Sequence, residues 1–303
     1  MLTLIFTLLK QQKNAKIIFQ EKTFSAKEIV QLAENLIAQH FPKKLPKRIA
    51  FCLPNSPQLF AWHIACLAYG IESAPLICDE TPNFLHAALK LIKPDIVITS
   101  KIIQERCQFT YPILIDKKIS SPVTLSKKPL RKLSENKLAF ILFSSGGSLK
   151  GSMHSYKTFQ GFIDTLAIIL AVKKGLTYLV AQPMGHIGGI VTSLLTLINN
   201  GTVVLLPKFS ITGYLSALAK HKPTHINLHT PLFYALLNQK NIDKKAFSHI
   251  KTCFAAGDST AYNLPKEFTR LTGAPMQTGY GSTETGIVLV NRKPYGKNQR
   301  FYW

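Results

Sequence analysis

A run of glycine and hydroxyl residues follows one strongly apolar stretch of the chain. The stretch reads LAFILF, and residues 144–151 continue as Ser-Ser-Gly-Gly-Ser-Leu-Lys-Gly. Glycine-rich backbone can turn its N–H groups toward an anion, hydroxyls add donors, and a lysine supplies a positive charge, as a triphosphate requires. The run is not a Walker loop, because Lys150 precedes its glycine and no Gly-Lys-Ser/Thr follows. The alternative is an ordinary Ser/Gly turn between a strand and a helix.

A second run, residues 277–286, reads Gln-Thr-Gly-Tyr-Gly-Ser-Thr-Glu-Thr-Gly after an expected short strand near Pro275. It offers an aromatic face for a base, hydroxyls for a phosphate, and one carboxylate, Glu284. That carboxylate stands out, because the whole chain has only 15 acidic residues. Mg²⁺ is usually bound by one or two carboxylates together with substrate phosphates, so a single glutamate suffices for a magnesium site. The alternative is a hairpin turn whose glutamate is solvated.

Two further segments rich in small residues follow expected strands. Residues 183–189 read Pro-Met-Gly-His-Ile-Gly-Gly, in which His186 would line a substrate entrance. The alternative for His186 is a structural role at a helix N-terminus. Residues 255–259 read Ala-Ala-Gly-Asp-Ser, a strand end expected to open a helix. Small side chains there would let a flat ring approach the backbone closely.

The segments that position these loops alternate between apolar runs and amphipathic stretches. In the first part of the chain, strands are expected at 48–53, 74–77, 96–99 and 113–115, and helices at 59–69 and 84–92. In the second part, strands are expected at 138–143, 178–181, 203–206, 225–228 and 252–255, and helices near 156–170, 189–198, 213–219, 232–238 and 262–271. This alternation predicts an α/β fold with mainly parallel sheets, whose ligands bind at the carboxyl ends of strands.

Local signals mark the ends and boundaries of these elements. Ser25 and Glu28 have the spacing of a capping box before an expected helix. The apolar start lacks a basic region before it and a cleavage site after it, so we expect a first helix with Leu2, Ile5, Phe6 and Leu9 on one face, and no signal peptide. Residues 116–137 are expected to be a linker or exposed loop. It divides a first α/β subdomain, 1–137, from a second, 138–303, which carries the two glycine-rich runs.

Composition excludes several classes of protein. With 46% hydrophobic and 17% charged residues, the chain can bury a large core and is not wholly disordered. No apolar run reaches the ~18–20 residues that a membrane-spanning helix needs. The five cysteines are scattered without a C-x-x-C pair. This pattern favours reduced thiols in a cytoplasmic protein over a disulfide framework or a zinc site.

The net charge of +22 would ordinarily suggest a nucleic-acid partner. Only six of the 37 basic residues are arginines, however, and the other 31 are lysines spread in ones and twos. Base-edge readout and bidentate phosphate contacts favour arginine, so we do not expect nucleic acid to be the partner. A solvated lysine-rich surface is the favoured explanation, and a polyanion or an anionic membrane surface is the alternative.

Taken together, the four loops resemble those of the adenylate-forming synthetases, the AMP-binding superfamily of acyl- and aryl-CoA ligases, luciferases and peptide-synthetase adenylation domains. The motifs that carry the resemblance are FSSGGSLKGSMHS, PMGHIGG, FAAGDS and GYGSTETG, in the family's order. The resemblance runs from about residue 20 to 290 and implies two stacked α/β subdomains with mainly parallel sheets, the N-terminal core of that fold. The absence of an aspartate near PMGHIGG favours the acyl/aryl branch.

The resemblance implies a two-step reaction. A carboxylic acid attacks the α-phosphorus of Mg·ATP to give an acyl-adenylate and pyrophosphate, and a thiol, commonly coenzyme A, then takes the acyl group. Four residues would carry catalysis: Lys150, His186 as the gate of the acyl pocket, Thr283 at the α-phosphate and Glu284 as the Mg²⁺ ligand. The nucleotide would be bound by Ser144, Ser145, Gly146, Gly147, Ser148, Lys150, Gly151, Ala256, Gly257, Tyr280 stacked on adenine, Gly281 and Thr283.

The sequence departs from the family pattern in three places. The phosphate loop is two residues shorter than the family's, lacks its paired threonines and has Leu149 where proline is usual. The later Tyr-x-Thr-Gly-Asp segment, whose aspartate binds the ribose, and the C-terminal lobe with its lysine are also expected to be absent. We therefore expect a ligase whose activity is weak or completed by a separate C-terminal lobe or by self-association. The alternatives are a non-catalytic remnant that binds an acyl group or a nucleotide, and a polyanion-binding protein.

Overall fold

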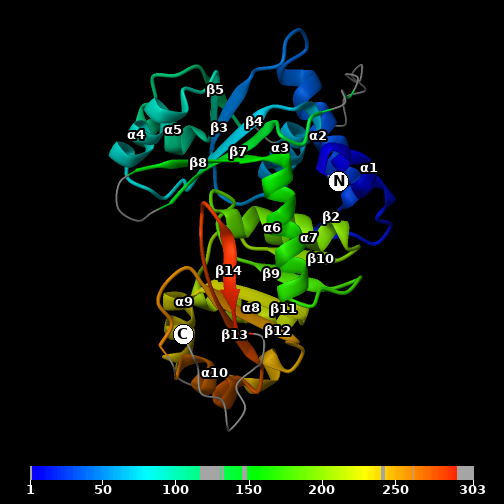
Figure 1. Ribbon diagram of the computed structural model, residues 1–303, viewed down its shortest axis with the longest axis vertical. Coiled ribbons are helices and arrows are strands. Elements are labelled where there is room, and N and C mark those ends of the chain that lie inside the picture. The colour runs from blue at the N-terminus through cyan, green and yellow to red at the C-terminus, as the bar shows by residue number, and fades with distance from the viewer. Residues whose placement is uncertain are drawn as a thin grey trace.

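The computed structural model describes residues 2–116, 130, 133–144, 149–239, 243–261 and 263–291, which form two stacked sheets with helices between and around them (Figure 1). The smaller sheet has the order β6-β5-β3-β4-β7-β8, and the larger has the order β14-β13-β12-β11-β9-β10-β1-β2. Neighbouring strands run parallel except for β8, β2 and β14, each of which pairs antiparallel with one neighbour. The expected α/β fold with mainly parallel sheets is confirmed.

The strands of the smaller sheet are β3 (Arg48–Cys52), β4 (Glu72–Leu76), β5 (Ile96–Thr99), β6 (Ile113–Ile115), β7 (Leu138–Phe143) and β8 (Gly151–Ser155). Those of the larger sheet are β1 (Lys16–Phe19), β2 (Lys22–Ser25), β9 (Thr177–Val180), β10 (Thr202–Leu205), β11 (His225–His229), β12 (Thr252–Ala256), β13 (Met276–Ser282) and β14 (Gly286–Val290). The helices are η1 (Leu2–Leu4), α1 (Ile5–Gln11), α2 (Ala26–His40), α3 (Pro57–Tyr69), α4 (Pro82–Ile92), α5 (Lys101–Cys107), α6 (Tyr156–Ile169), α7 (Ile187–Ile198), α8 (Ile211–His221), α9 (Thr230–Leu237), η2 (Lys244–Phe247) and α10 (Leu264–Thr272).

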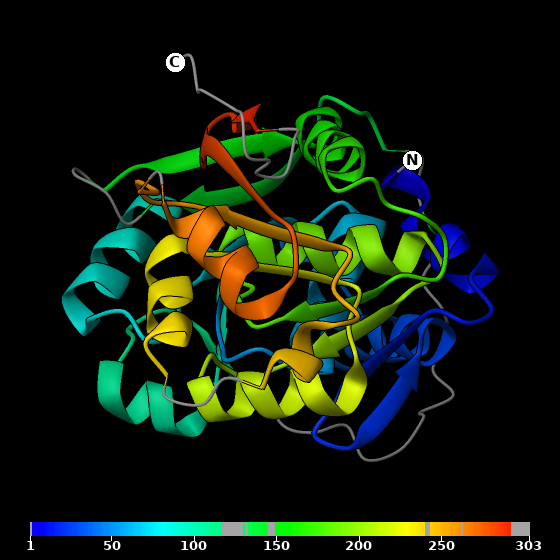
Figure 2. The same cartoon turned by 90° about the horizontal axis from the view of Figure 1, so that it is seen from below.

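Within the described residues, three hydrophobic cores lie between these layers. The central core joins the inner faces of both sheets to α1, α2, α3, α6 and α7, and an outer core lies between the smaller sheet and α4 and α5. The other outer core lies between the larger sheet and α8, α9 and α10, which Figure 2 shows from below. On β3, Phe51 faces the central core and Cys52 the outer one. Because both faces of the central strands are buried, their sequences are continuous apolar runs.

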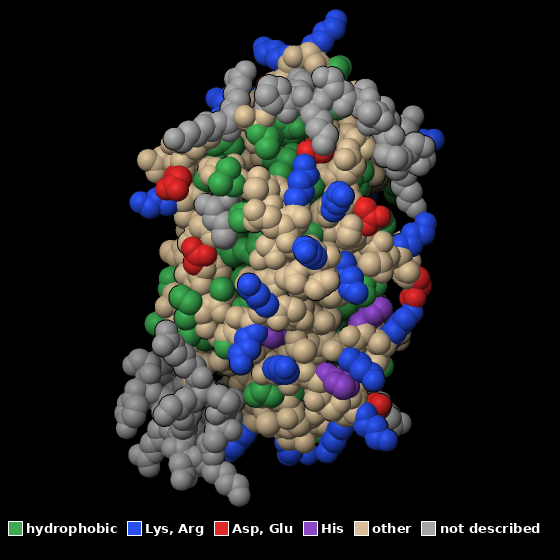
Figure 3. All heavy atoms as spheres, turned by 90° about the vertical axis from the view of Figure 1, so that its right-hand side faces the viewer, with side chains coloured by type: hydrophobic (Ala, Val, Ile, Leu, Met, Phe, Trp, Pro, Cys, Tyr) green, Lys and Arg blue, Asp and Glu red, His purple; other side chains and the backbone are tan. Residues whose placement is uncertain are grey.

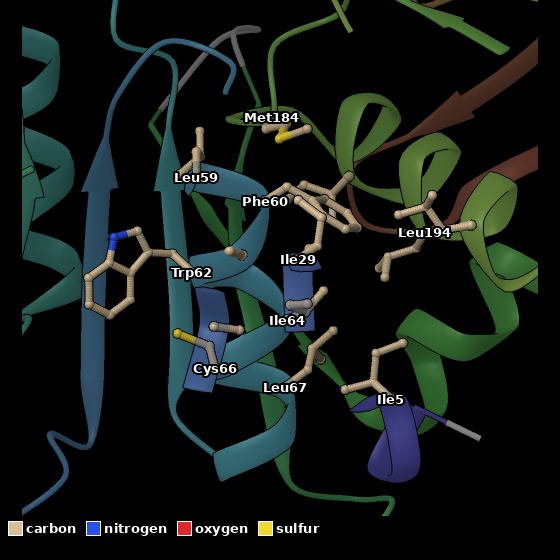
Figure 4. Close-up of a cluster of buried hydrophobic side chains, with 14 of the residues drawn as sticks. Ile5, Ile29, Leu59, Phe60, Trp62, Ile64, Cys66, Leu67, Met184 and Leu194 are labelled. Atoms are coloured by element: carbon tan, nitrogen blue, oxygen red, sulfur yellow. The ribbon is translucent and has the colours of Figure 1, made fainter. Parts of the chain in front are cut away.

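The central core depends on large side chains from α3. In Figure 4, Phe60 of α3 points toward Leu194 of α7, whereas Trp62 points the other way, toward the smaller sheet. The Trp62 ring packs against the Phe51 ring at 6.1 Å between centroids, and all three aromatic side chains are at least 99% buried. This helix therefore contacts both the smaller sheet and the helices of the larger one.

Several local expectations are confirmed. The Ser25 N–H donates to Glu28 Oε2 at 2.7 Å and the Glu28 N–H to Ser25 Oγ at 3.2 Å, which is the predicted capping box of α2. The predicted apolar face of the first helix, which includes Leu2 and Leu9, is buried in the central core. Most of the expected linker at 116–137 lies outside the described residues.

Sheet membership does not follow the expected boundary between residues 137 and 138. Strands β1 and β2 join the larger sheet, because β1 pairs in parallel with β10. Strands β7 and β8 join the smaller sheet, because β7 pairs in parallel with β4 and in antiparallel with β8. Each sheet thus contains strands from both parts of the chain, and the subdomain division at 137/138 stays a prediction about folding units.

Asn55, just after β3, joins the two sheets. Its Nδ2 donates to the Gln182 carbonyl at 2.9 Å and to the Leu206 carbonyl at 3.1 Å, and its Oδ1 accepts from the Met184 N–H at 2.7 Å. These partners follow β9 and β10 of the larger sheet, and Asn55 itself is 97% buried. The Asn55 side chain, which follows a strand of the smaller sheet, therefore satisfies three backbone groups that follow strands of the larger sheet.

The surface is rich in lysine, as the composition requires. Figure 3 shows lysine and arginine side chains spread singly over one face, with a few acidic side chains among them. Among the described residues, no helix is both long and apolar enough to cross a membrane.

Asn55→Ala should destabilise the fold by on the order of 2–4 kcal/mol, because it leaves buried carbonyl and N–H groups without partners. The measurement is the free energy of unfolding from urea denaturation. Asn199→Ala is the matched control, since the bond that the Asn199 side chain donates among the described residues is a local one, to the Leu195 carbonyl at 2.8 Å. We expect the control to lose about 1 kcal/mol or less. Equal losses in the two variants would contradict the role assigned to Asn55.

His63 should make the fold sensitive to acid. Complete burial beside Phe51 and Phe140 lowers its pKa to about 3, below the ordinary value of 6.5. The unfolded chain therefore binds a proton that the folded chain excludes between about pH 6.5 and pH 3. In that window the free energy of unfolding falls with decreasing pH, by up to about 1.4 kcal/mol per pH unit from this residue.

Denaturation of His63→Gln at several pH values from 7 to 4 should give a shallower fall than the parent chain. The control is His249→Gln at an exposed position, which should keep the parent's slope. A parent-like slope in His63→Gln would refute the assignment.

Candidate functional site

A pocket of about 440 Å³ lies at the carboxyl ends of the central strands of the larger sheet. Its walls come from the ends of β7, β9, β11 and β12, from α6 and the start of α7, and from the turn between β13 and β14. Parallel sheets place ligands at this edge. The structure brings together in this one pocket a group of residues predicted from the sequence: Ser144, His186, Ala256, Gly257, Gly281, Thr283 and Glu284.

His186 lines the pocket and also caps a helix. Its Nδ1 accepts a hydrogen bond from the Gly188 N–H at 3.1 Å at the first turn of α7, so the ring proton lies on Nε2. Burial, and second the neighbouring His229, lower the pKa of His186 to about 4, which keeps the ring neutral at pH 7. His186 can therefore act in both of the ways considered from the sequence, since it lines the pocket and also caps the N-terminus of a helix.

His229, at the end of β11, is a pocket residue that the sequence analysis missed. Its ring lies edge-on to His186, with 5.0 Å between centroids and an interplanar angle of 72°. Burial lowers the pKa of His229, while Asp258 acts in the opposite direction. The pocket therefore has two adjacent imidazoles that are mainly neutral near pH 7.

Gly257 allows His229 to occupy this place. Gly257 has φ +90°, and a Cβ on it would lie 2.5 Å from His229 Nδ1. The missing side chain thus makes room for a ring of the protein itself, and the approach of a ligand's ring to this backbone stays a prediction. Seven residues separate the end of β12 at Ala256 from α10, which begins at Leu264, close to the start expected for this helix near residue 262.

The second glycine-rich run forms a hairpin and not a loop, which corrects the expectation from the sequence. Its residues up to Ser282 extend β13, which pairs with β12 through Met276–Thr278 and with β14 through 279–282. Glycines make this pairing possible, since a Cβ on Gly281 would lie 2.1 Å from the Gly286 carbonyl oxygen. The turn presents a buried Thr283 and an exposed Glu284, so the hairpin alternative describes the local backbone correctly.

The carboxylate of Glu284 is kept ionised by its surroundings. A hydrogen bond from Ser282 is the largest cause that lowers its pKa, followed by its own backbone N–H, and Lys150 and His154 act in the same direction. A charged carboxylate at the rim of the pocket is suited to a cation such as Mg²⁺. Within the described part of the chain, no group of three or more His, Cys, Asp or Glu side chains could hold a metal ion.

The predicted phosphate loop is only partly described. Ser144, directly after β7, lines the pocket, whereas Ser145, Gly146, Gly147 and Ser148 lie outside the described residues. Lys150 is exposed and acts on the charge of Glu284, but it does not line the pocket. Gly151, expected in the loop, is the first residue of β8 because it pairs with Phe143 across the hairpin.

Tyr280 also lies outside the pocket lining. Its side chain is 65% exposed on β13, opposite Leu289 of β14. Its stacking on an adenine therefore stays a prediction.

Several pocket residues could not be found from motifs. Gln182 and Asn227 place amide groups in the wall, and apolar walls come from Phe162, Leu166, Ile187, Val191, Phe254 and Ile287. Asn227 stands in the middle of the strand sequence HINLH, where the one available signal is a polar residue between two apolar ones.

The family assignment rests on the sequence. The sequence pattern of the AMP-binding enzymes matches residues 10–301, so the chain belongs to that family. It is 23% identical over 300 residues to the human mitochondrial acyl-coenzyme A synthetase ACSM3, covering 90% of this chain and 51% of that protein. It is 22% identical over 284 residues to the 2-succinylbenzoate–CoA ligase of Bacillus pumilus, covering 92% and 57%. The chain thus spans a little over half the length of these relatives.

The solved structures agree with the fold. ATP-bound MatB from Rhodopseudomonas palustris superposes with a TM-score of 0.84 over 98% of this chain and 62% of that one, at 21% identity. The N-terminal domain of FACL13 from Mycobacterium tuberculosis gives 0.82 over 94% and 78%, at 14% identity. The two stacked, mainly parallel α/β layers are therefore those of adenylate-forming enzymes.

Gly257→Ala should reshape the pocket, because its Cβ would displace His229 and the backbone conformation is strained for alanine. We expect ligand affinity at the pocket to fall at least tenfold beyond any loss of stability. Gly273→Ala is the matched control, with φ +75° and open space around its Cβ. Calorimetric titration with ATP and thermal denaturation of both variants measure the two effects. Parallel behaviour of the two variants would contradict the close-packing argument.

Proposed function

We propose that the pocket binds Mg·ATP and a small carboxylic acid and that the acid is activated there as an acyl-adenylate. The carboxylate oxygen attacks the α-phosphorus, and pyrophosphate leaves. The observation that carries this proposal is the convergence of Ser144, His186, Gly257 and the Thr283–Glu284 turn on one pocket at the carboxyl ends of parallel strands. The family membership and the name of the ATP-bound relative support ATP as the nucleotide.

The nucleotide end of the pocket would lie along β12 and the β13–β14 turn. The half-buried Ala256 and the exposed Gly257 present little more than backbone, which a flat base can approach closely. The hydroxyls of Ser144 and Thr283 are donors for phosphate oxygens. Catalysis would consist of positioning and of stabilising charge that develops on the phosphates, with Lys150 as a further cation near Glu284.

Magnesium fits the residues present. One ionised, exposed carboxylate is available at Glu284, and Mg²⁺ commonly keeps its waters and binds one or two carboxylates together with substrate phosphates. When bound, the ion would neutralise phosphate charge. Glu284 would hold it, and Ser282 would keep the Glu284 carboxylate ionised.

The acyl group would lie toward His186 and the apolar walls from α6 and α7. A thiol, for which the relatives' names favour coenzyme A, would take the acyl group in a second step. For this step we propose a contribution from a second copy of the chain, and we place the protein in the cytoplasm. The family relationship makes a ligase the favoured class over a polyanion-binding protein.

Calorimetric titration with ATP, with and without Mg²⁺, tests the first step. Saturable binding in the micromolar range that depends on Mg²⁺ is the expected result, and carboxylate-dependent exchange of labelled pyrophosphate into ATP would show turnover. ATP binding without exchange would support a non-catalytic binding protein of the same fold. No binding by a folded chain would overturn the proposal.

Glu284→Gln should weaken the binding of Mg·ATP by about 10- to 100-fold, as expected for the loss of one charged ligand. Binding of ATP without Mg²⁺ should change little, and so should the free energy of unfolding, because Glu284 is exposed. Since the pKa of Glu284 is lowered, the Mg²⁺ effect should persist across the neutral range and decline only as the pH falls below the ordinary carboxyl range.

The control for this variant is Glu105→Gln, an exposed glutamate on α5 that pairs with Lys101 and does not line the pocket. It should bind Mg·ATP as the parent chain does. A Glu284→Gln chain with the parent's Mg²⁺ dependence would show that the metal is held elsewhere.

A further inference from the structure

Two buried amide side chains form a pair in the pocket wall. The Asn227 Nδ2 on β11 donates to the Gln182 Oε1, just after β9, at 2.9 Å. Both residues are 93% buried and both line the pocket. Buried amides in a pocket wall are unexpected unless every donor and acceptor has a partner.

The pair leaves two polar groups unused. Asn227 Oδ1 is buried and has no hydrogen-bond partner among the described residues. Gln182 Oε1 is taken by Asn227, which leaves the Gln182 NH₂ group as a donor. Turning both amides over exchanges the functions of the two residues but still leaves one carbonyl oxygen and one NH₂ group. These two groups are adjacent, because the amides are bonded to each other.

The chain is built to accommodate this pair. A Cβ on Gly188 would lie 2.2 Å from Gln182 Oε1, so only glycine at the first turn of α7 leaves room for the amide. The nearby hydroxyl of Thr192 is already used, since it donates to the Gly188 carbonyl at 2.6 Å. Thr192 therefore offers no donor to the unused oxygen of the pair.

The charge of the wall limits what can bind to the pair. Among the described residues that line the pocket, the ionisable ones are Glu284 and the two histidines, and none is a lysine or an arginine. Burial lowers the pKa of both His186 and His229, so the end of the pocket near the amide pair has no strong positive charge near pH 7. A second carboxylate would find no counter-ion there. An uncharged group that both donates and accepts a hydrogen bond would satisfy both unused amide groups.

We propose that the acid taken by this pocket has a hydroxyl group on an otherwise apolar tail, and that the Asn227–Gln182 pair is its specificity determinant. The hydroxyl would donate to Asn227 Oδ1 and accept from the Gln182 NH₂ group. This proposal rests on the proposed function, since it assigns the tail of the acid to the same pocket. A site built to bond a hydroxyl discriminates strongly against the analogue without it, because the buried polar groups are then left unpaired.

The experiment compares the binding of acids that differ only in the hydroxyl. The pairs are benzoate with 4-hydroxybenzoate, 3-phenylpropionate with 3-(4-hydroxyphenyl)propionate, and hexanoate with 6-hydroxyhexanoate. Each is titrated calorimetrically into the full chain, alone and with saturating ATP, so that nucleotide binding is read separately from acid binding. We expect at least one hydroxy acid to bind at least tenfold more tightly than its partner.

Variants then assign the preference to the amide pair. Asn227→Leu should abolish the preference by weakening the hydroxy acid at least tenfold while leaving its unsubstituted partner unchanged or bound more tightly. Gln182→Met should act in the same direction and provides a second test if Asn227→Leu does not fold, as thermal denaturation will show. Thr196→Val is the matched control: the buried Thr196 hydroxyl donates to the Thr192 carbonyl at 2.7 Å on the same helix, Thr196 does not line the pocket, and the variant should keep the preference.

Equal binding within every pair, or no binding of any acid, would overturn this proposal. A preference that survives both amide substitutions would also overturn it. A bound water that satisfies Asn227 Oδ1 would give that result. Failure of the proposed function has a different signature, which is the absence of ATP binding. A hydroxyl preference without ATP binding would retain the acid site and overturn only the adenylation step.

Discussion

The packing of both sheets onto one shared layer of helices is the constraint on which the rest of the structure depends. Phe60 and Trp62 of α3 face opposite ways, and Leu194 of α7 meets α3 in the central core. Because each sheet is also covered on its outer face, its central strands are buried on both sides. Polar chemistry is then confined to the strand ends, where the pocket lies.

Much of the fold could be predicted from local sequence. The apolar runs 96–99, 113–115 and 138–143 form strands with the expected bounds, and the Ser25–Glu28 capping box forms as expected. The short, polar-flanked strands β1, β2 and β8 were not predicted, because they are defined by their pairing partners. Membership of a sheet is likewise set by contacts between distant segments, such as β1 with β10, which no local pattern encodes.

Some residues of the candidate site could likewise be predicted from the sequence, and others could not. The glycine and hydroxyl clusters could be recognised in the sequence because they directly follow apolar runs. Ser144, His186, Gly257, Thr283 and Glu284 do converge on one pocket. Gln182, Asn227 and His229 were not visible as a group, since each stands in or beside a strand with no distinctive neighbour. Their proximity arises from the parallel order of β9, β11 and β12. The extended backbone of 277–282 was missed because its glycines suggested a loop, whereas they serve close strand pairing.

The hydrogen bonds that Asn55 makes between the two sheets have a consequence for the motion of the pocket wall. The backbone groups of Gln182 and Met184 are bonded to Asn55, and Gly185 packs so closely on β4 that a Cβ would lie 2.5 Å from the Leu76 carbonyl carbon. A loop held from both sheets opens less readily by a local fluctuation than a loop held from one sheet, since opening must break contacts with both. The stability of the wall beside His186 is therefore coupled to the packing of the two sheets on each other.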